Sequence, residues 1–325
     1  MMSSSFKNKL LMLSLLLGLG FSSMLPSTTP NPEFRVSILQ LVEHPALDAT
    51  ERGITDELKE AFKGKNLHID YQSAQGNSAL AAQIAQKYAS NSPNVMVGIA
   101  TISAQALVAA DKRQLIPVVF SSVTDPKAAQ LVQNLEKPEG VVTGVSNYVD
   151  PGLQFDLFKK ILPNLKKIGI IYNPGEANSV ALNAEMEKIA KIKNIELVFA
   201  PANTSADVSQ ATNNLMNKVQ AIFVNNDNTA LSAFDSIVKI ATKHQVPVFC
   251  SDTDMIERGA LAVLGPNQYE VGRQTGKMIV KIMQGEKISQ IPVGFPEKTE
   301  IKLNAEQAKK LKIEIPKNLL NLENN

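Results

Sequence analysis

Short apolar runs alternate with amphipathic segments along the chain, and this alternation predicts strands and helices in turn. The segments "RVSILQLV", "LHIDYQ", "VMVGIA" and "IPVVF" have the length and composition of buried strands. Helices are predicted between them, from about Pro45, over Ala79 to Tyr88, and from about Ser103. Strands separated by helices of this length imply right-handed crossovers and a parallel sheet that is covered on both faces.

The same rhythm starts again after "GVVTGVSNYVDPG". Helices are predicted over 152–161, 177–193, 205–217 and 229–243, and they alternate with the strands "KIGIIYN", "IELVFA", "AIFVNN" and "VPVFC". A chain of 325 residues is also long for one core. The sequence therefore predicts the α/β class, with two doubly wound parallel-sheet lobes that divide near residue 147.

Two of the predicted strands end in similar polar loops, "IPVVFSSVTDP" in the first half and "VPVFCSDTD" in the second. Ligands of open parallel sheets bind outside the carboxyl ends of the strands. Two such sheets facing each other enclose a cleft. We expect the ligand-binding side chains to be Glu43, Thr101, Ser103, Ser121, Ser122, Asn147, Glu176, Asn178, Asp227, Asn228 and Asp252.

The chemistry of these loops favours a zwitterionic ligand. They contain no lysine or arginine, which disfavours a phosphate or dicarboxylate held by ion pairs. Hydroxyls and free N–H groups at the helix start Thr101 to Ser103, with Ser121 and Ser122, can hold one carboxylate. An ammonium group suits Asp252, with Asp227 or Glu176 as alternatives. For any single residue of the set, helix capping is the competing interpretation.

Residues 1–24 have the pattern of a signal peptide. Lys7 and Lys9 precede an apolar stretch from Leu10 to Phe21, and small residues follow it. The stretch is shorter than the roughly 20 residues that span a bilayer, which disfavours the alternative of an uncleaved anchor. The single cysteine, Cys250, lies far from this leader, so the chain offers no lipidation site there and no internal disulfide.

Charge and motifs exclude other classes of function. The chain has 33 Lys and Arg against 31 Asp and Glu, without a basic patch, which makes a nucleic-acid partner unexpected. The three histidines show no metal-ligand spacing, and no nucleophile elbow, Walker loop or dinucleotide fingerprint is present. We therefore expect no catalysis, no metal and no cofactor. Acid/base catalysis by the pair Asp252 and Asp254 is the weaker alternative to a purely binding role.

Several longer segments resemble the substrate-binding proteins of bacterial ABC transporters, in particular the type I periplasmic-binding fold of tryptophan/tyrosine-binding components. They include "QLVEHPALDATERGITDELKE", "VVTGVSNYVD", "IYNPGEANSV", "IFVNNDNTALSA" and "GRQTGKMIVKIMQGE". The resemblance covers about Arg35 to Leu320. It implies two lobes joined by a hinge of three crossings and closing around one small ligand.

The resemblance also implies an assignment of the chain to lobes and partners. Residues 34–147 plus 256–289 are expected in lobe 1, with 259–282 supplying a last strand and helix there. Residues 148–255 plus 290–325 are expected in lobe 2. The implied function is capture of an amino acid, most simply an aromatic one, in the periplasm by a monomer that delivers it to an inner-membrane permease. A non-transport sensor of the same fold, or a binder of a sugar or nucleoside, stays open as an alternative.

Overall fold

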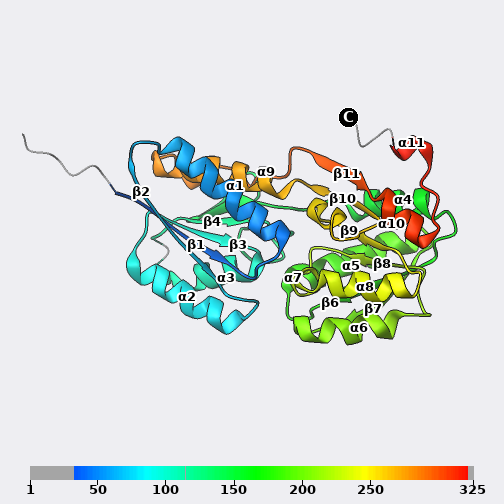
Figure 1. Cartoon of the computed structure of the whole chain (residues 1–325). Coiled ribbons are helices and arrows are strands. Elements are labelled where there is room, and N and C mark those ends of the chain that lie inside the picture. Colours follow the sequence, from blue (N-terminus) through cyan, green and yellow to red (C-terminus); the bar gives the residue numbers. More distant parts are fainter. Residues whose placement is uncertain (1–32, 114, 321–325) are drawn as a thin grey trace, which may run out of the picture. The chain divides into compact units, whose positions relative to one another are not determined.

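The computed structural model describes residues 33–113 and 115–320, and the predicted signal peptide, 1–24, lies outside them. Two sheets organise these residues (Figure 1). The first sheet has the order β2-β1-β3-β4-β5, and all of its strands are parallel. Its strands are β1 (Glu33–Gln40), β2 (Asn66–Ser73), β3 (Val95–Ile99), β4 (Val118–Ser121) and β5 (Val142–Val145).

The second sheet has the order β11-β10-β9-β8-β6-β7. Its strands are β6 (Lys167–Tyr172), β7 (Glu196–Pro201), β8 (Ala221–Val224), β9 (Val248–Cys250), β10 (Ala262–Pro266) and β11 (Thr299–Leu303). The strands β6 to β10 are parallel and repeat the order of the first sheet, whereas β11 pairs antiparallel with β10 at the edge. The prediction of two doubly wound parallel-sheet lobes is confirmed, with one antiparallel edge strand added.

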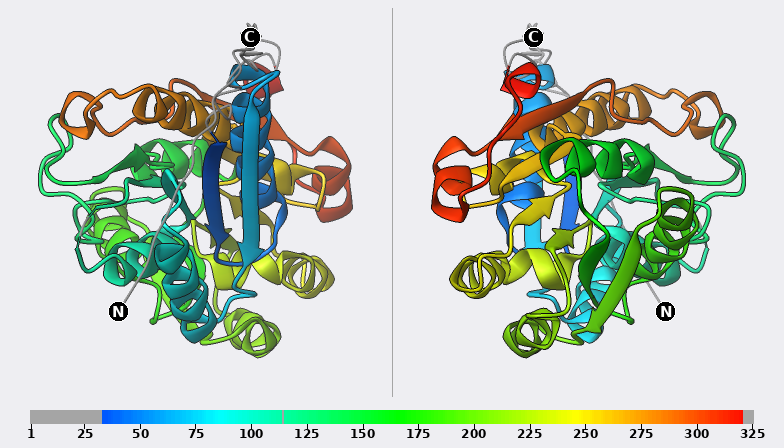
Figure 2. Two further views of the ribbon diagram at one scale, coloured as in Figure 1. Left: turned by 90° about the vertical axis from the view of Figure 1, so that its left-hand side faces the viewer. Right: turned by 90° about the vertical axis from the view of Figure 1, so that its right-hand side faces the viewer.

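Helices cover both faces of each sheet, as the apolar strands require (Figure 2). In the first lobe α2 (Ser78–Asn91) and α3 (Thr101–Ala110) pack on one face and α1 (Pro45–Ala61) on the other. In the second lobe α4 (Pro151–Ile161) and α5 (Ala177–Ile192) cover one face, and α6 (Val208–Leu215) and α8 (Phe234–Lys243) the other. The remaining α-helices are α7 (Asn228–Ser232), α9 (Gln268–Met283), α10 (Ala305–Leu311) and α11 (Lys317–Leu320).

Helix α9 belongs to the first lobe because it packs directly against α1 (Figure 1). A Cβ atom on Gly53 would lie 2.1 Å from the backbone oxygen of Tyr269, and one on Gly272 would lie 2.1 Å from that of Thr50. Only glycine allows two helices to approach so closely, so the two helices are held as one unit. Ile279 of α9 adds to the apolar core beneath them.

The chain crosses between the sheets three times: after β5, between β10 and α9, and before β11. The first and third crossings run side by side. The Ser146 N–H donates to the Gly294 carbonyl at 2.8 Å, and the Gly294 N–H donates to the Gly144 carbonyl at 2.9 Å. This arrangement is the three-crossing hinge that the family resemblance implied.

One element expected in lobe 1 lies elsewhere. The strand predicted within 259–282 is β10, and it pairs with β9 in the second sheet, with Ala262 opposite Phe249. Of this segment, only helix α9 returns to the first lobe. Strand β10 lies between β9 and β11 in the second sheet and is buried on both faces. The other lobe boundaries stay predictions. Within the described residues, no helix has the length and apolar character needed to cross a membrane.

Candidate functional site: a cavity between the two sheets

A small cavity lies where the carboxyl ends of strands from both sheets meet. Its lining comes from the loops and helix starts that follow β1, β4 and β5 in the first sheet and β6, β8 and β9 in the second. The lining residues are His44, Ala46, Leu47, Ser122, Asn147, Asn178, Asn226, Asn228, Leu231 and Asp252. The position agrees with the rule that parallel sheets bind ligands outside these strand ends.

Five of the predicted residues therefore meet at one place: Ser122, Asn147, Asn178, Asn228 and Asp252. The cavity has a free volume of about 10 Å³, which is the space of one water molecule. A wider groove of about 430 Å³ adjoins it at Asn228, and residues of both lobes, such as Asn77 and Asn203, line that groove. An amino acid fills the cavity only after the lobes or their side chains have moved apart.

Direct hydrogen bonds between the lobes close the cavity. The Asn226 side-chain amide donates to the Thr124 hydroxyl at 3.3 Å and to the Asn147 side-chain oxygen at 3.4 Å. His44 Nε2 lies 3.4 Å from Asn228 Oδ1, again across the two lobes. Burial lowers the pKa of His44 to about 4, so this ring is neutral at pH 7 and holds Asn228 without a charge.

The start of α3 carries two buried hydroxyls. Thr101 and Ser103 are 1% and 0% exposed, and neither Oγ atom has a hydrogen-bond partner among the described residues. The residue before the helix is Ala100, with φ +75°. Its side chain cannot accept a hydrogen bond, so no N-cap side chain pairs with the first N–H groups of α3. Buried hydroxyls without partners are costly, which favours a bound polar group at this helix start.

Two of the predicted acidic residues serve the start of α7 instead of facing the cavity. Glu176 accepts from the backbone N–H groups of Asn228 and Thr229 at 3.0 and 2.9 Å, and from both of their side chains. Asp227 accepts from the N–H of Ala230 at 2.8 Å and that of Asn173 at 2.6 Å. Both carboxylates are thus occupied by donors from the protein itself.

Asp227 is still electrostatically unusual. Burial, and then the nearby charge of Glu176, raise its pKa to about 7, although its two backbone hydrogen bonds oppose the shift. A carboxylate close to another is harder to ionise. Asp227 therefore titrates near neutral pH while it organises the start of α7.

Asp252 differs from these two because one of its oxygens has no donor. Its Oδ1 accepts from Gln268 Nε2 at 2.7 Å, whereas Oδ2 has no hydrogen-bond donor in the part of the chain that the structure describes. The residue is 2% exposed and lines the cavity. Burial raises its pKa to about 7, the Gln268 hydrogen bond opposes this, and the charge of Asp254 adds to it. A cation beside Oδ2 would relieve the cost of this buried charge.

Four further predicted residues do not line the cavity: Thr101 and Ser103, whose helix reaches the adjoining groove through Ile102, and Glu43 and Ser121. Glu43 is exposed, and its neighbour His44 takes the buried place. The Ser121 hydroxyl lies 2.7 Å from that of Thr275 in α9, so it ties β4 to that helix. His44 and Asn226 were absent from the predicted set. Their position next to Glu43 and Asp227 in the same polar loops was the signal available for finding them.

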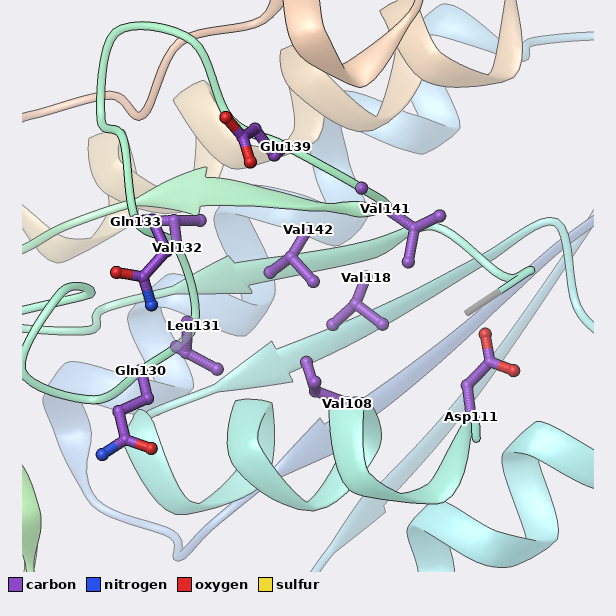
Figure 3. A pocket seen from close by; sticks show the side chains of 11 residues that line it. Val108, Asp111, Val118, Gln130, Leu131, Val132, Gln133, Glu139, Val141 and Val142 are labelled. Atoms are coloured by element: carbon purple, nitrogen blue, oxygen red, sulfur yellow. The ribbon is translucent and has the colours of Figure 1, made fainter. Parts of the chain in front are cut away.

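A separate hollow of about 200 Å³ lies in the first lobe (Figure 3). Val108 near the end of α3 and the first residues of β4 and β5, Val118 and Val142, line it together with Leu131. These are the amino ends of the strands, so the hollow is at the opposite end of the sheet from the cavity. None of the predicted ligand-binding residues lines it.

Comparison with known families identifies the class of protein. Residues 35–325 match the family described as ABC transporter substrate binding protein. The chain is an ABC transporter substrate-binding protein. Members of this class bind solutes outside the cytoplasmic membrane for a permease, and they are not enzymes. The predictions of family, fold and absence of catalysis are confirmed by this match and by the structures below.

This substrate-binding protein is 35% identical over 286 residues to a tyrosine-binding protein of Clostridioides difficile, covering 87% of this chain and 82% of that one. It is also similar to a Streptococcus pneumonia ABC domain solved in complex with L-Trp. That likeness has a TM-score of 0.86 and 33% identity, and it covers 90% of this chain and 98% of the other.

A third similarity bears on the conformation. The ligand-free, open structure of a substrate-binding protein with adhesive properties from Clostridium difficile is 37% identical, covering 88% of this chain and 97% of the other, yet its TM-score is only 0.66. The L-Trp complex is less similar in sequence but more similar in structure. The substrate-binding protein described here is therefore more similar in structure to the relative in complex with L-Trp than to the ligand-free, open one.

Proposed function

We propose that this protein binds one aromatic amino acid in the cavity between its sheets and delivers it to an inner-membrane ABC permease. The proposal is carried by a carboxylate oxygen of Asp252 without a donor, in the lining of the cavity, and by two unpartnered hydroxyls at the start of α3, a helix whose Ile102 lines the adjoining groove. A zwitterion needs one acceptor site and one donor site. One relative is named as tyrosine-binding and another was solved with L-Trp, so we assign an aromatic side chain to the ligand of this protein.

The ammonium group of the ligand binds Asp252 Oδ2 in this proposal. No lysine or arginine lines the cavity, and burial keeps His44 neutral, so no protein cation competes for that oxygen. Glu176 and Asp227 are weaker candidates because donors of α7 and, for Asp227, also the N–H of Asn173 already occupy their oxygens. A desolvated ion pair of this kind gives strong, directional binding.

The carboxylate group binds the start of α3 in this proposal. Thr101 and Ser103 supply hydroxyl donors, and the first N–H groups of this ten-residue helix add the positive end of its dipole. Ser122 lines the cavity and is a further donor, whereas the Ser121 hydroxyl is engaged by Thr275. Helix α3 also contacts α5 of the second lobe, so closure brings this donor site against the residues of the other sheet.

Capture requires movement of the lobes about the three crossings. An open state admits the amino acid, and the closed state gains the hydrogen bonds of Asn226 and His44 between the lobes in addition to those of the ligand. Release to the permease reverses this step. We propose that the mature protein acts as a periplasmic monomer after removal of residues 1–24.

A ligand screen tests the proposal. Protein stripped of bound ligand by unfolding and refolding is melted in the presence of each common amino acid, and of representative sugars and nucleosides. A ligand at 100 times its dissociation constant adds about 2.7 kcal/mol of stability. Tyrosine, tryptophan or phenylalanine should raise the melting temperature most. Stabilisation by a sugar or nucleoside, with none by an aromatic amino acid, would contradict the proposal.

A further inference from the structure

Gln268, the first residue of α9, connects three elements through one side-chain amide. Its Oε1 accepts from the Ser122 hydroxyl at 3.0 Å and from the Thr50 hydroxyl at 3.3 Å. Its Nε2 donates to Asp252 Oδ1 at 2.7 Å. The side chain is 1% exposed, and both hydroxyl partners are buried as well. The amide is therefore bound on both sides and shielded from water.

The bond from Gln268 to Asp252 joins the two lobes. Gln268 moves with the first lobe, because α9 and α1 touch backbone to backbone at Gly53 and Gly272. Asp252 follows β9, so it moves with the second sheet. The second crossing, between β10 and α9, ends immediately before Gln268. A hydrogen bond this close to a pivot experiences little displacement when the lobes rotate.

The surroundings fix which way the amide points. An ionised Asp252 offers only acceptors, so the nitrogen end of Gln268 must face it and the oxygen end must face the two hydroxyls. Ser122 and Thr50 also lie 3.1 Å from each other, and Thr50 can donate to the Ala46 carbonyl at 3.1 Å. The network thus holds Oδ1 of Asp252 and leaves Oδ2 to the cavity.

We propose that Gln268 is the positioning residue for ligand recognition: it orients the carboxylate of Asp252 toward the ligand and links that carboxylate to the first lobe. This inference rests on the proposed function, because it assumes that Asp252 receives the ammonium group. Gln268 itself does not line the cavity and is not expected to touch the ligand.

The variant Gln268→Glu tests the role of the amide nitrogen. A glutamate has nearly the same shape and still accepts from Ser122 and Thr50, but it places a second carboxylate at hydrogen-bond distance from Asp252. Two carboxylates at this distance do not both stay ionised, so one binds a proton. At pH 8 we expect the affinity for L-tyrosine or L-tryptophan to fall at least about tenfold, and at pH 5.5 the loss relative to wild type should shrink to about threefold or less.

The affinity of wild type at both pH values serves as the control for neighbouring titratable groups. Asp254 and Cys250 flank Asp252, Arg52 and Lys302 act on Asp254, and His44 lies across the cavity. Burial raises the pKa of Cys250 and lowers that of His44 to about 4, so neither changes charge between pH 5.5 and 8. Asp252 itself, with a pKa of about 7, and Asp254 change the affinity of wild type over this range too, so each variant is compared with wild type at the same pH.

Two comparisons separate this role from general damage. Gln268→Leu can neither form the bond nor bind a proton, so its loss of affinity should not shrink at pH 5.5. Gln284→Glu puts the same charge on the exposed end of α9 and should bind like wild type. If Gln268→Glu does not fold, Gln268→Asn, which withdraws the amide by one methylene group, should lose about tenfold in affinity at both pH values.

The outcomes are distinct. Wild type that binds neither L-tyrosine nor L-tryptophan contradicts the proposed function and, with it, this inference. Wild type that binds, with Gln268→Glu equally tight at pH 8 or equally weakened at both pH values, overturns the inference alone. The expected pH-dependent loss supports it.

Discussion

Asn226, in the loop after β8, donates its side-chain amide at 3.3 Å to the hydroxyl of Thr124, in the loop after β4. The same nitrogen reaches two oxygens of Asn147, and the Asn226 oxygen accepts from Ser251 at 2.7 Å. The side chain thereby holds the lobes closed from within the cavity. Every ligand that enters must share the space with it or displace it.

The first prediction concerns this contact. Asn226→Ala removes its own bonds to Thr124 and Asn147, at a cost of about 1 kcal/mol each to the closed state. We therefore expect the ligand-free variant to populate the open state more, and small-angle scattering should give a larger radius of gyration than for wild type. Asn213→Ala, at an exposed position on α6, is the control and should leave the radius unchanged. Equal radii for Asn226→Ala and wild type would contradict the role of this contact.

The second prediction concerns Asp252. Removing one partner of a buried charge pair typically costs 2–5 kcal/mol, so Asp252→Ala should weaken binding of the amino acid at least about 30-fold and leave the fold intact. Asn304→Ala provides the comparison, because Asn304 caps α10 and lines neither the cavity nor the adjoining groove. That change should cost about 1 kcal/mol of stability and spare binding. Calorimetry on both folded variants decides, and near-native affinity for Asp252→Ala would rule out its role.

The third prediction concerns Glu176, which holds the start of α7 by four donors from Asn228 and Thr229. Glu176→Ala leaves buried donors without an acceptor, so we expect the free energy of unfolding to fall by about 2 kcal/mol or more. Among molecules that fold, the dissociation constant should change less than for Asp252→Ala. Urea unfolding and calorimetry on the same samples test both parts. A variant of wild-type stability with much weaker binding would instead make Glu176 the ligand's partner.

The fourth prediction follows from the raised pKa of Asp252, about 7 against an ordinary 3.8. A folded-state pKa above the unfolded one favours folding fully below pH 4, and this contribution is lost as the pH rises through 7. Asp252→Asn removes the titration but keeps an oxygen for Gln268. In the ligand-free protein it should therefore raise the melting temperature at pH 8 and change it little at pH 4, with an upper limit of about 4 kcal/mol from 1.36 kcal/mol per pKa unit. An equal change in melting temperature at pH 4 and pH 8 would show that the pKa of Asp252 is not raised by folding.

The architecture was predictable because it depends on local patterns. Apolar strands alternate with helices, and a helix between two strands forces them to be parallel. The strand β10 was predicted in the wrong lobe. The sheet to which it belongs is decided by its pairing with Phe249 and Cys250, and no local sequence pattern indicates that pairing. Its sequence is apolar enough for the centre of either sheet.

The candidate site was predictable only as a set of loops. Where β4 ends, Ser121 and Ser122 look alike in the sequence, yet φ at Ser122 is +54° and only that residue lines the cavity. Glu43 and His44 are separated in the same way. Glu176 precedes its own helix but caps α7, a relationship that exists only once β6 and β8 are neighbours. Which member of each loop faces the cavity is decided by tertiary contacts.

The measurement closest to the central claim compares three ligands of the stripped protein by calorimetry at pH 8. L-tyrosine carries both charges, tyramine lacks the carboxylate, and 4-hydroxyphenylpropionate lacks the ammonium group. With Asp252 and the start of α3 as the two recognition points, L-tyrosine should bind at least about 30-fold more tightly than either analogue. Binding of 4-hydroxyphenylpropionate as tight as that of L-tyrosine would contradict the account, because no ammonium group would then meet Asp252.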